Sequence, residues 1–365
     1  MVWVPPVASS LDEFGANVPS WLQHLPTAVI NYRWAGSSQT SDYAASNHNA
    51  EPEGQSPAFL SWPTPIHDTL FGYSWITKNL SPPNYGRRDV YVCGSYLGAS
   101  LAAALALTES HSHHAMAVRG LVAYNGIYNW TTFLPDHPLR RAKEQDPADM
   151  AYSPTDDQPG SVFHYLQHQV PALFQSPADL FDPFASACLF FHTAGLLVPP
   201  DFETSSASSA FLRAVDLLAQ GGLDPAASGA EEPLKAPRRG YLAFPPRKST
   251  LKIPPTLLLH QTPPRAARSD ASAQRRLPGR RKKRPVVREN NFATQAESLA
   301  TAMRRSIEKL EFKERMRWDD EFDDLDGGAE RRVQVADVGP SAGVTEFGDR
   351  GQAAVKMWLE EKMGL

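Results

Sequence analysis

The stretch that decides the fold is DVYVCGSYLG, residues 89–98, which continues directly into ASLAAALALTE, residues 99–109. The VYVC run is typical of a buried strand, and the Ala- and Leu-rich run that follows is typical of a helix. Between them, Gly94 and Gly98 stand four positions apart, and glycine is the residue that tolerates a sharp and crowded turn. The stretch therefore predicts a strand that turns tightly into a helix, which is the unit of a parallel α/β sheet.

Outside this stretch, short apolar runs alternate with longer segments in which apolar residues recur every three or four positions. The sequence therefore predicts an α/β fold in which helices cover both faces of a mostly parallel sheet. The predicted strands are residues 27–33, 89–93, 118–124, 255–260 and, more weakly, 331–336, with a further strand and the loop after it expected within residues 2–6. The predicted helices are residues 99–109, 292–318 and 353–363.

The order of these elements resembles the α/β-hydrolase fold, in which a Gly-x-Ser-x-Gly turn, the nucleophile elbow, follows a central strand. The segments TAVINYRW (residues 27–34) and GSYLG (residues 94–98) resemble an uncharacterised branch of that superfamily seen in filamentous fungi. The resemblance covers most of the chain outside its inserts. It implies a hydrolase-type sheet with a cap insertion, and an elbow and oxyanion region that include Gly94, Leu97 and Gly98.

The catalytic residues of that family do not carry over to this sequence. Tyr96 stands at the nucleophile position, and a phenol with a pKa of about 10 is a poor acyl acceptor at neutral pH. His260 is the last histidine of the chain, so none follows the final predicted strand, and Gln261 stands where the acid is expected. Pro5-Pro6 provides no backbone N–H for an oxyanion hole. These departures predict a non-catalytic protein that binds a partner or a small apolar ligand in the former acyl pocket.

A first alternative is a serine esterase or thioesterase with a rearranged site that acts on an acyl substrate. It would use Ser95, one position before Tyr96, as the nucleophile and His192 or His260 as the base. Against it, a histidine among apolar residues is more often a hydrogen-bonded packing residue than a catalytic base.

A second alternative, from another class, is a nuclear or nucleic-acid-associated protein. Residues 262–288 contain ten Arg or Lys against the single Asp270, with RRKKR continuous at 280–284. Clustered cations favour polyanion binding, although no aromatic residue interleaves this run as base stacking would need. Self-repulsion predicts that this basic segment is disordered when free.

We interpret the chain as one domain in three parts. Residues 1–130 form the amino-terminal part of the core with the elbow at 94–98, residues 131–250 form the cap insertion, and residues 251–365 complete the core around the basic segment. Members of the resembled family have two strands ahead of the strand at residues 2–6. The sheet is therefore expected to lack its first edge strands, and either a protein partner covers the exposed edge or the chain is a truncated gene model.

Composition excludes several other classes of protein. No run approaches the roughly 20 apolar residues of a membrane span, and the amino terminus lacks a signal-peptide pattern, so a cytoplasmic or nuclear location is expected. The net charge of -4 argues against a generally nucleic-acid-binding surface. Cys93 and Cys188 are too few for a disulfide framework. The His111-Ser-His-His114 run is expected to be surface loop, so neither a metal site nor a cofactor is predicted.

Overall fold

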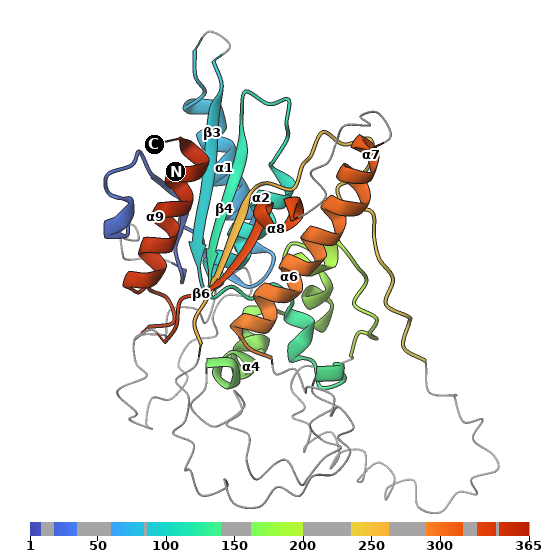
Figure 1. The fold of residues 1–365 in the computed structure, drawn as a ribbon. Helices are drawn as coiled ribbons and strands as arrows, with labels where there is room; N and C mark the ends of the chain where they lie inside the picture. The colour runs from blue at the N-terminus through green and yellow to red at the C-terminus, as the bar shows by residue number, and fades with distance from the viewer. Residues whose placement is uncertain are drawn as a thin grey trace, which may run out of the picture.

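A computed structural model describes residues 1–8, 18–34, 60–83, 86–139, 162–199, 235–262, 290–316, 327–340 and 343–364. Within these residues lies a single six-stranded sheet, all of whose strands are parallel, in the order β2-β1-β3-β4-β5-β6 (Figure 1). The α/β fold class predicted from the sequence is thus confirmed. The strands are β1 (Val2–Val4), β2 (Ala28–Val29), β3 (Arg88–Ser95), β4 (Met116–Tyr124), β5 (Thr256–His260) and β6 (Val333–Asp337).

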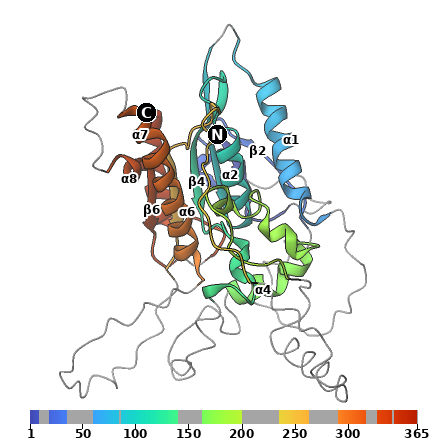
Figure 2. The same cartoon turned by 90° about the vertical axis from the view of Figure 1, so that its right-hand side faces the viewer.

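Helices cover the two faces of the sheet unequally. On one face α1, α2 and α6 contribute to the larger apolar cluster, and on the other face α9 packs against the smaller one. Figure 2 shows α1, α2 and α6 beside the sheet. The helices are α1 (Thr64–Asn79), α2 (Leu97–Thr108), α4 (Val162–Leu173), α6 (Phe292–Ser306), α7 (Lys313–Arg315), α8 (Gly328–Arg332) and α9 (Asp349–Met363), with a π-helical turn over Ile307–Phe312 and 3-10 turns over Ser20–Leu22, Trp130–Phe133, Pro177–Phe181 and Ala187–Phe190.

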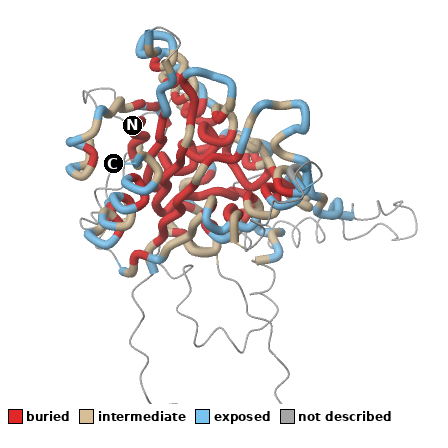
Figure 3. The backbone as a smooth tube through the Cα atoms, turned by 45° about the horizontal axis from the view of Figure 1, so that its top comes forward, coloured by how far each residue is buried: buried red, intermediate tan, exposed pale blue. Residues whose placement is uncertain are grey.

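Strand β3 shows how the alternation of side chains divides the core. Val90 and Val92 belong to the cluster under α1, α2 and α6, whereas Tyr91 and Cys93 belong to the cluster under α9. All four side chains are less than a tenth exposed, as expected for a central parallel strand that is covered on both faces. Figure 3 shows this continuous buried interior running through the sheet and its flanking helices.

Two predicted strands are shorter than expected. Strand β2 pairs with β1 only over Ala28 and Val29, because β1 itself ends ahead of Pro5-Pro6, which cannot donate to a ladder. At the other edge, Arg331 and Arg332 end α8 instead of beginning β6, and the Arg332 guanidinium pairs with Glu311.

The predicted helix over residues 292–318 is interrupted after Ser306. The π-helical turn that follows has more residues per turn, so it moves the buried position from the expected Leu310 to Phe312. The recurrence of apolar residues every three or four positions could not reveal this change, because a prediction from that spacing assumes one helical pitch throughout.

Candidate functional site

The turn between β3 and α2 has a strained backbone at Tyr96. Its φ of 52° and ψ of −119° lie in a region that non-glycine residues rarely adopt, at a cost of roughly 1–3 kcal/mol. Its N–H donates to the Tyr124 carbonyl at 2.8 Å, which ties the turn to β4. The sharp strand-to-helix turn predicted from the sequence is therefore present, with Tyr96 at its apex.

Both glycines of this elbow are needed for close backbone approach. A Cβ on Gly94 would lie 2.6 Å from the Gly98 carbonyl oxygen, and a Cβ on Gly98 would lie 2.0 Å from the Pro5 carbonyl oxygen. Real Cβ atoms do not approach backbone this closely. The Gly-x-x-x-Gly spacing is therefore required by the close approach of β3, α2 and the loop after β1.

The N–H of Leu97, which follows the apex residue and would be an oxyanion-hole donor in a hydrolase, is already engaged. It donates to the Pro6 carbonyl at 3.2 Å. The neighbouring Pro5 carbonyl accepts a hydrogen bond from the Tyr32 hydroxyl at 3.1 Å. An oxyanion at this turn would therefore have to displace an existing hydrogen bond to gain a single donor.

Tyr96 projects its ring into the larger apolar cluster. It is 2% exposed, and its ring centre lies 6.5 Å from that of Phe292 at the start of α6. Phe292 contacts Phe163 of α4 at 4.8 Å, and Phe163 stacks on Phe133 at 5.8 Å. This aromatic line, Tyr96, Phe292, Phe163 and Phe133, covers the elbow with side chains of the protein itself.

Ser95 lies on β3 one position before the apex and continues the alternation that puts Cys93 in the cluster under α9. Its Oγ atom is buried and has no hydrogen-bond partner. No imidazole of the described residues therefore lies within hydrogen-bond distance of this hydroxyl, and the structure does not bring Ser95 together with His192 or His260.

His260 ends β5 and pairs in register with Asp337 at the end of β6. It is 9% exposed, and its Nδ1 atom is buried without a hydrogen-bond partner. Asp337 accepts hydrogen bonds from the Thr262 hydroxyl and, at 2.8 Å, from the Gly339 N–H. Burial opposes ionisation of Asp337, but these bonds and the charges of His260 and Arg350 hold its pKa below the ordinary value.

His192 lies in the segment predicted as the cap, residues 131–250, and follows the 3-10 turn over Ala187–Phe190. Its Nδ1 donates to the Thr193 carbonyl at 3.0 Å, which leaves Nε2 as the acceptor of a hydrogen bond from the Arg239 guanidinium. Burial and the Arg239 charge both lower its pKa. His192 is thus a hydrogen-bonded neutral imidazole whose accepting nitrogen is occupied by Arg239.

The two cysteines are, like Ser95, poorly placed to act as nucleophiles. Cys93 on β3 and Cys188 in the cap are both fully buried free thiols. Burial raises the pKa of each to about 12, so neither carries the thiolate that would attack a substrate at neutral pH.

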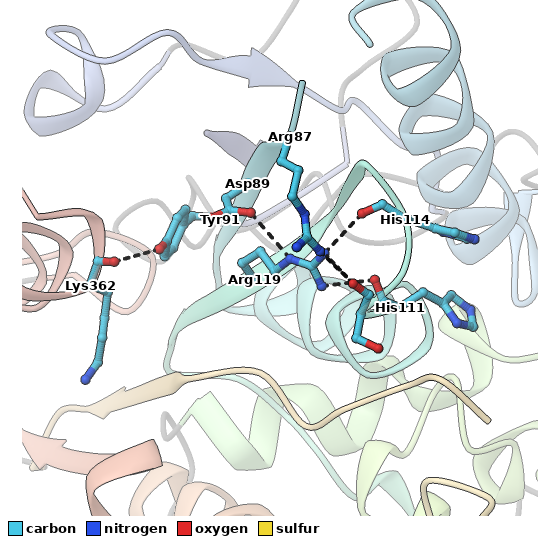
Figure 4. Close-up of polar contacts among 8 residues, drawn as sticks. Arg87, Asp89, Tyr91, His111, His114, Arg119 and Lys362 are labelled. Atoms are coloured by element: carbon cyan, nitrogen blue, oxygen red, sulfur yellow. Dashed lines mark hydrogen bonds and ion pairs between the residues drawn. The ribbon is translucent and has the colours of Figure 1, made fainter. Parts of the chain in front are cut away.

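The histidine loop between α2 and β4 lies at the opposite end of the sheet from the elbow. Its carbonyls hold Arg119, which donates to His111 O at 3.0 Å and to His114 O at 3.1 Å and pairs with Asp89 at 3.4 Å (Figure 4). Nδ1 of His111 is hydrogen-bonded to the Thr250 hydroxyl at 2.9 Å. Over the described parts of the chain, no group of three or more His, Cys, Asp or Glu is arranged to hold a metal ion.

Sequence reasoning missed Gln295, the buried polar residue that joins α6 to the segment after β4. Its Oε1 accepts from the N–H groups of Tyr128 and Asn129 at 3.0 and 2.9 Å, and its Nε2 donates to Thr132 Oγ1 and Asn290 Oδ1 at 3.0 and 2.8 Å. The available signal was a glutamine beside Ala296 on the apolar face of a predicted helix, where buried polar groups need partners.

Acid is expected to destabilise the protein through His137, which follows the 3-10 turn over Trp130–Phe133. Burial and then the Arg239 charge lower the pKa of His137 to about 4, whereas the unfolded chain has the ordinary 6.5. The unfolded state therefore binds the proton first, and stability that is complete above pH 6.5 is lost as the pH falls towards 4. Between pH 7.5 and pH 5 we expect a loss of about 1–2 kcal/mol from this group in urea unfolding.

Replacing the imidazole isolates its share of this pH dependence. His137→Gln should flatten the stability profile over the same interval, whereas His24→Gln, at an exposed position, should leave the profile as in the parent chain. A profile in His137→Gln that is as steep as in the parent would contradict this assignment.

No protein-family model, no curated protein and no solved structure matches this chain. Among the residues described, no helix is long and apolar enough to cross a bilayer.

Proposed function

We propose that this chain is a non-catalytic binding protein built on a hydrolase-type sheet, and that it acts through a protein partner more than through a ligand in the former acyl pocket. The observation that carries the proposal is the elbow itself. Its apex residue is a phenol that is 2% exposed, and the N–H that follows it is engaged by Pro6. A hydrolase needs an accessible nucleophile and available donors at this point.

The strained backbone at the apex needs an explanation if Tyr96 is not a nucleophile. A tyrosine with positive φ is tolerated where the surrounding packing determines the backbone, and a Cβ added to either elbow glycine would clash with neighbouring backbone. The turn is therefore retained as part of the scaffold.

A protein partner is favoured over a pocket ligand because of where apolar surface is exposed. The side chains over the elbow are buried, whereas Phe71 and Trp75, one turn apart on α1, are 77% and 55% exposed. Two exposed aromatic residues on adjacent turns are the kind of anchor that protein interfaces use.

Labelling with a fluorophosphonate probe tests the loss of catalysis. The full chain should not be labelled and should hydrolyse p-nitrophenyl butyrate no faster than Ser95→Ala. Tyr96→Ser restores a hydroxyl at the apex and should remain unlabelled, because the Leu97 N–H that would stabilise the oxyanion already donates to the Pro6 carbonyl. The control is a serine hydrolase of known activity labelled in the same gel.

Labelling of the parent chain that disappears in Ser95→Ala would overturn the proposal in favour of the rearranged esterase or thioesterase. Labelling that appears only in Tyr96→Ser would show that the remaining apparatus is competent, and would also overturn it. The nucleic-acid alternative depends on residues 263–288, which lie outside the described residues.

A further inference from the structure

Helix α4 carries two histidines whose ring nitrogens meet on its outer face. His164 and His168 are one turn apart, their Nε2 atoms are 3.1 Å from each other, and their rings lie at 79°. The residues of α4 that face the core are different ones, Phe163, Leu166, Val170 and Leu173. His168 is exposed and His164 half-buried, so the pair meets at the surface of the cap, on the helix labelled α4 in Figures 1 and 2.

The separation of the two nitrogens fits chelation of a metal ion. Imidazole nitrogens bind zinc at about 2.0–2.1 Å, and two such bonds to atoms 3.1 Å apart enclose an angle of about 98° at the metal. That angle lies between the right angle of an octahedral or tetragonal site and the tetrahedral angle. The side chains therefore need little rearrangement once the proton between the two nitrogens has moved from Nε2 to Nδ1 of the same ring, which leaves both Nε2 lone pairs for the metal.

We propose that His164 and His168 form a two-histidine chelate for one divalent transition-metal ion, Cu²⁺, Ni²⁺ or Zn²⁺, with water in the remaining positions. Imidazole ligands suit these ions and not Mg²⁺ or Ca²⁺, which prefer oxygen. A helical i,i+4 pair is pre-positioned, so the second bond forms at a high effective concentration once the first has formed.

The chelate would lie on a helix whose backbone hydrogen bonds are interrupted by a proline. Pro171 lies inside α4 and has no N–H to donate to the carbonyl one turn earlier, so the backbone ladder is interrupted in a helix of only 12 residues. A metal ion across the preceding turn stabilises the helical conformation there. Because Phe163 of the same helix packs on Phe292, metal binding also stabilises the aromatic line over the elbow.

The experiment is calorimetric titration of the full chain with NiCl₂, CuSO₄ and ZnCl₂, alongside His164→Gln and His168→Gln. One site should bind in the order Cu²⁺, Ni²⁺, Zn²⁺, and either single substitution should weaken it about 100-fold, with the double variant no weaker than the singles. The melting temperature of the parent chain should rise with NiCl₂, and that of either variant should not.

Matched controls separate this site from other histidines. His67→Gln removes an exposed helical histidine of α1, and His113→Gln removes one from the histidine loop; both should keep the Ni²⁺ site of the parent. His168→Gln alters an exposed side chain, so its metal-free melting temperature should equal that of the parent. Unchanged Ni²⁺ affinity in both α4 variants, or an equal loss in His67→Gln, would overturn the proposal.

Discussion

Gly98→Ala is expected to destabilise the protein by at least about 3 kcal/mol. The new Cβ would lie 2.0 Å from the Pro5 carbonyl oxygen and 2.5 Å from that of Val4. Both clashing atoms belong to the backbone, which cannot change rotamer as a flexible side chain can. Helix α2 must therefore move away from β1. The melting temperature should fall by roughly 6 °C or more, measured by circular dichroism with urea unfolding as the second readout.

Gly343→Ala is the matched control, because its nearest contacts would be 3.8 Å or longer and its φ needs no glycine. It should change stability by less than about 0.5 kcal/mol. A tolerated Gly98→Ala would mean that α2 is not held against the loop after β1, and would remove the packing explanation of the elbow glycines.

Gln295→Leu is expected to cost about 3 kcal/mol or more. The leucine has nearly the same size but offers no acceptor to the N–H groups of Tyr128 and Asn129, which are left buried and unpaired at roughly 1–3 kcal/mol each. The residue is 2% exposed, so water cannot replace the lost partners without opening the contact between α6 and the turn over Trp130–Phe133.

The loss of stability in Gln295→Leu should be largest at the contact between α6 and the turn over Trp130–Phe133. Hydrogen exchange of the Tyr128 and Asn129 amides should accelerate in Gln295→Leu more than exchange of amides in β3, because the nearest support of the cap is lost first. Gln23→Leu, at an exposed position, should leave both stability and exchange within error of the parent. Equal destabilisation by the two substitutions would contradict the role given to Gln295.

Much of the architecture could be predicted from local sequence. The VYVC run, the paired glycines and the Ala-rich run predicted β3, the tight turn and α2, because each is favoured by backbone and side-chain preferences that neighbours in the chain supply. The apolar run at Leu257–Leu259 likewise predicted a strand buried on both faces. The limits of β2 and the π-helical turn after Ser306 were not predictable, because a strand extends only as far as its partner and pitch depends on packing.

The candidate site depended more strongly on tertiary structure. That a tyrosine stands at the middle of the Gly94–Gly98 turn is evident from the sequence, but the direction of the Ser95 side chain is not, since it follows from the register of β3 in a sheet covered on both faces. Three sets of hydrogen bonds join segments far apart in the chain: that of the Leu97 N–H to Pro6, that of Arg239 to His192, and those of Gln295 to Tyr128, Asn129 and Thr132.

The sequence by itself thus determined the fold class, the position of the elbow and the identity of the residue at its apex. These properties depend on backbone preference and on the spacing of apolar residues, which are local. Only the tertiary structure decided which groups are paired, which are buried and which face each other, because hydrogen bonds and aromatic contacts between distant segments exist only once the sheet has brought those segments together.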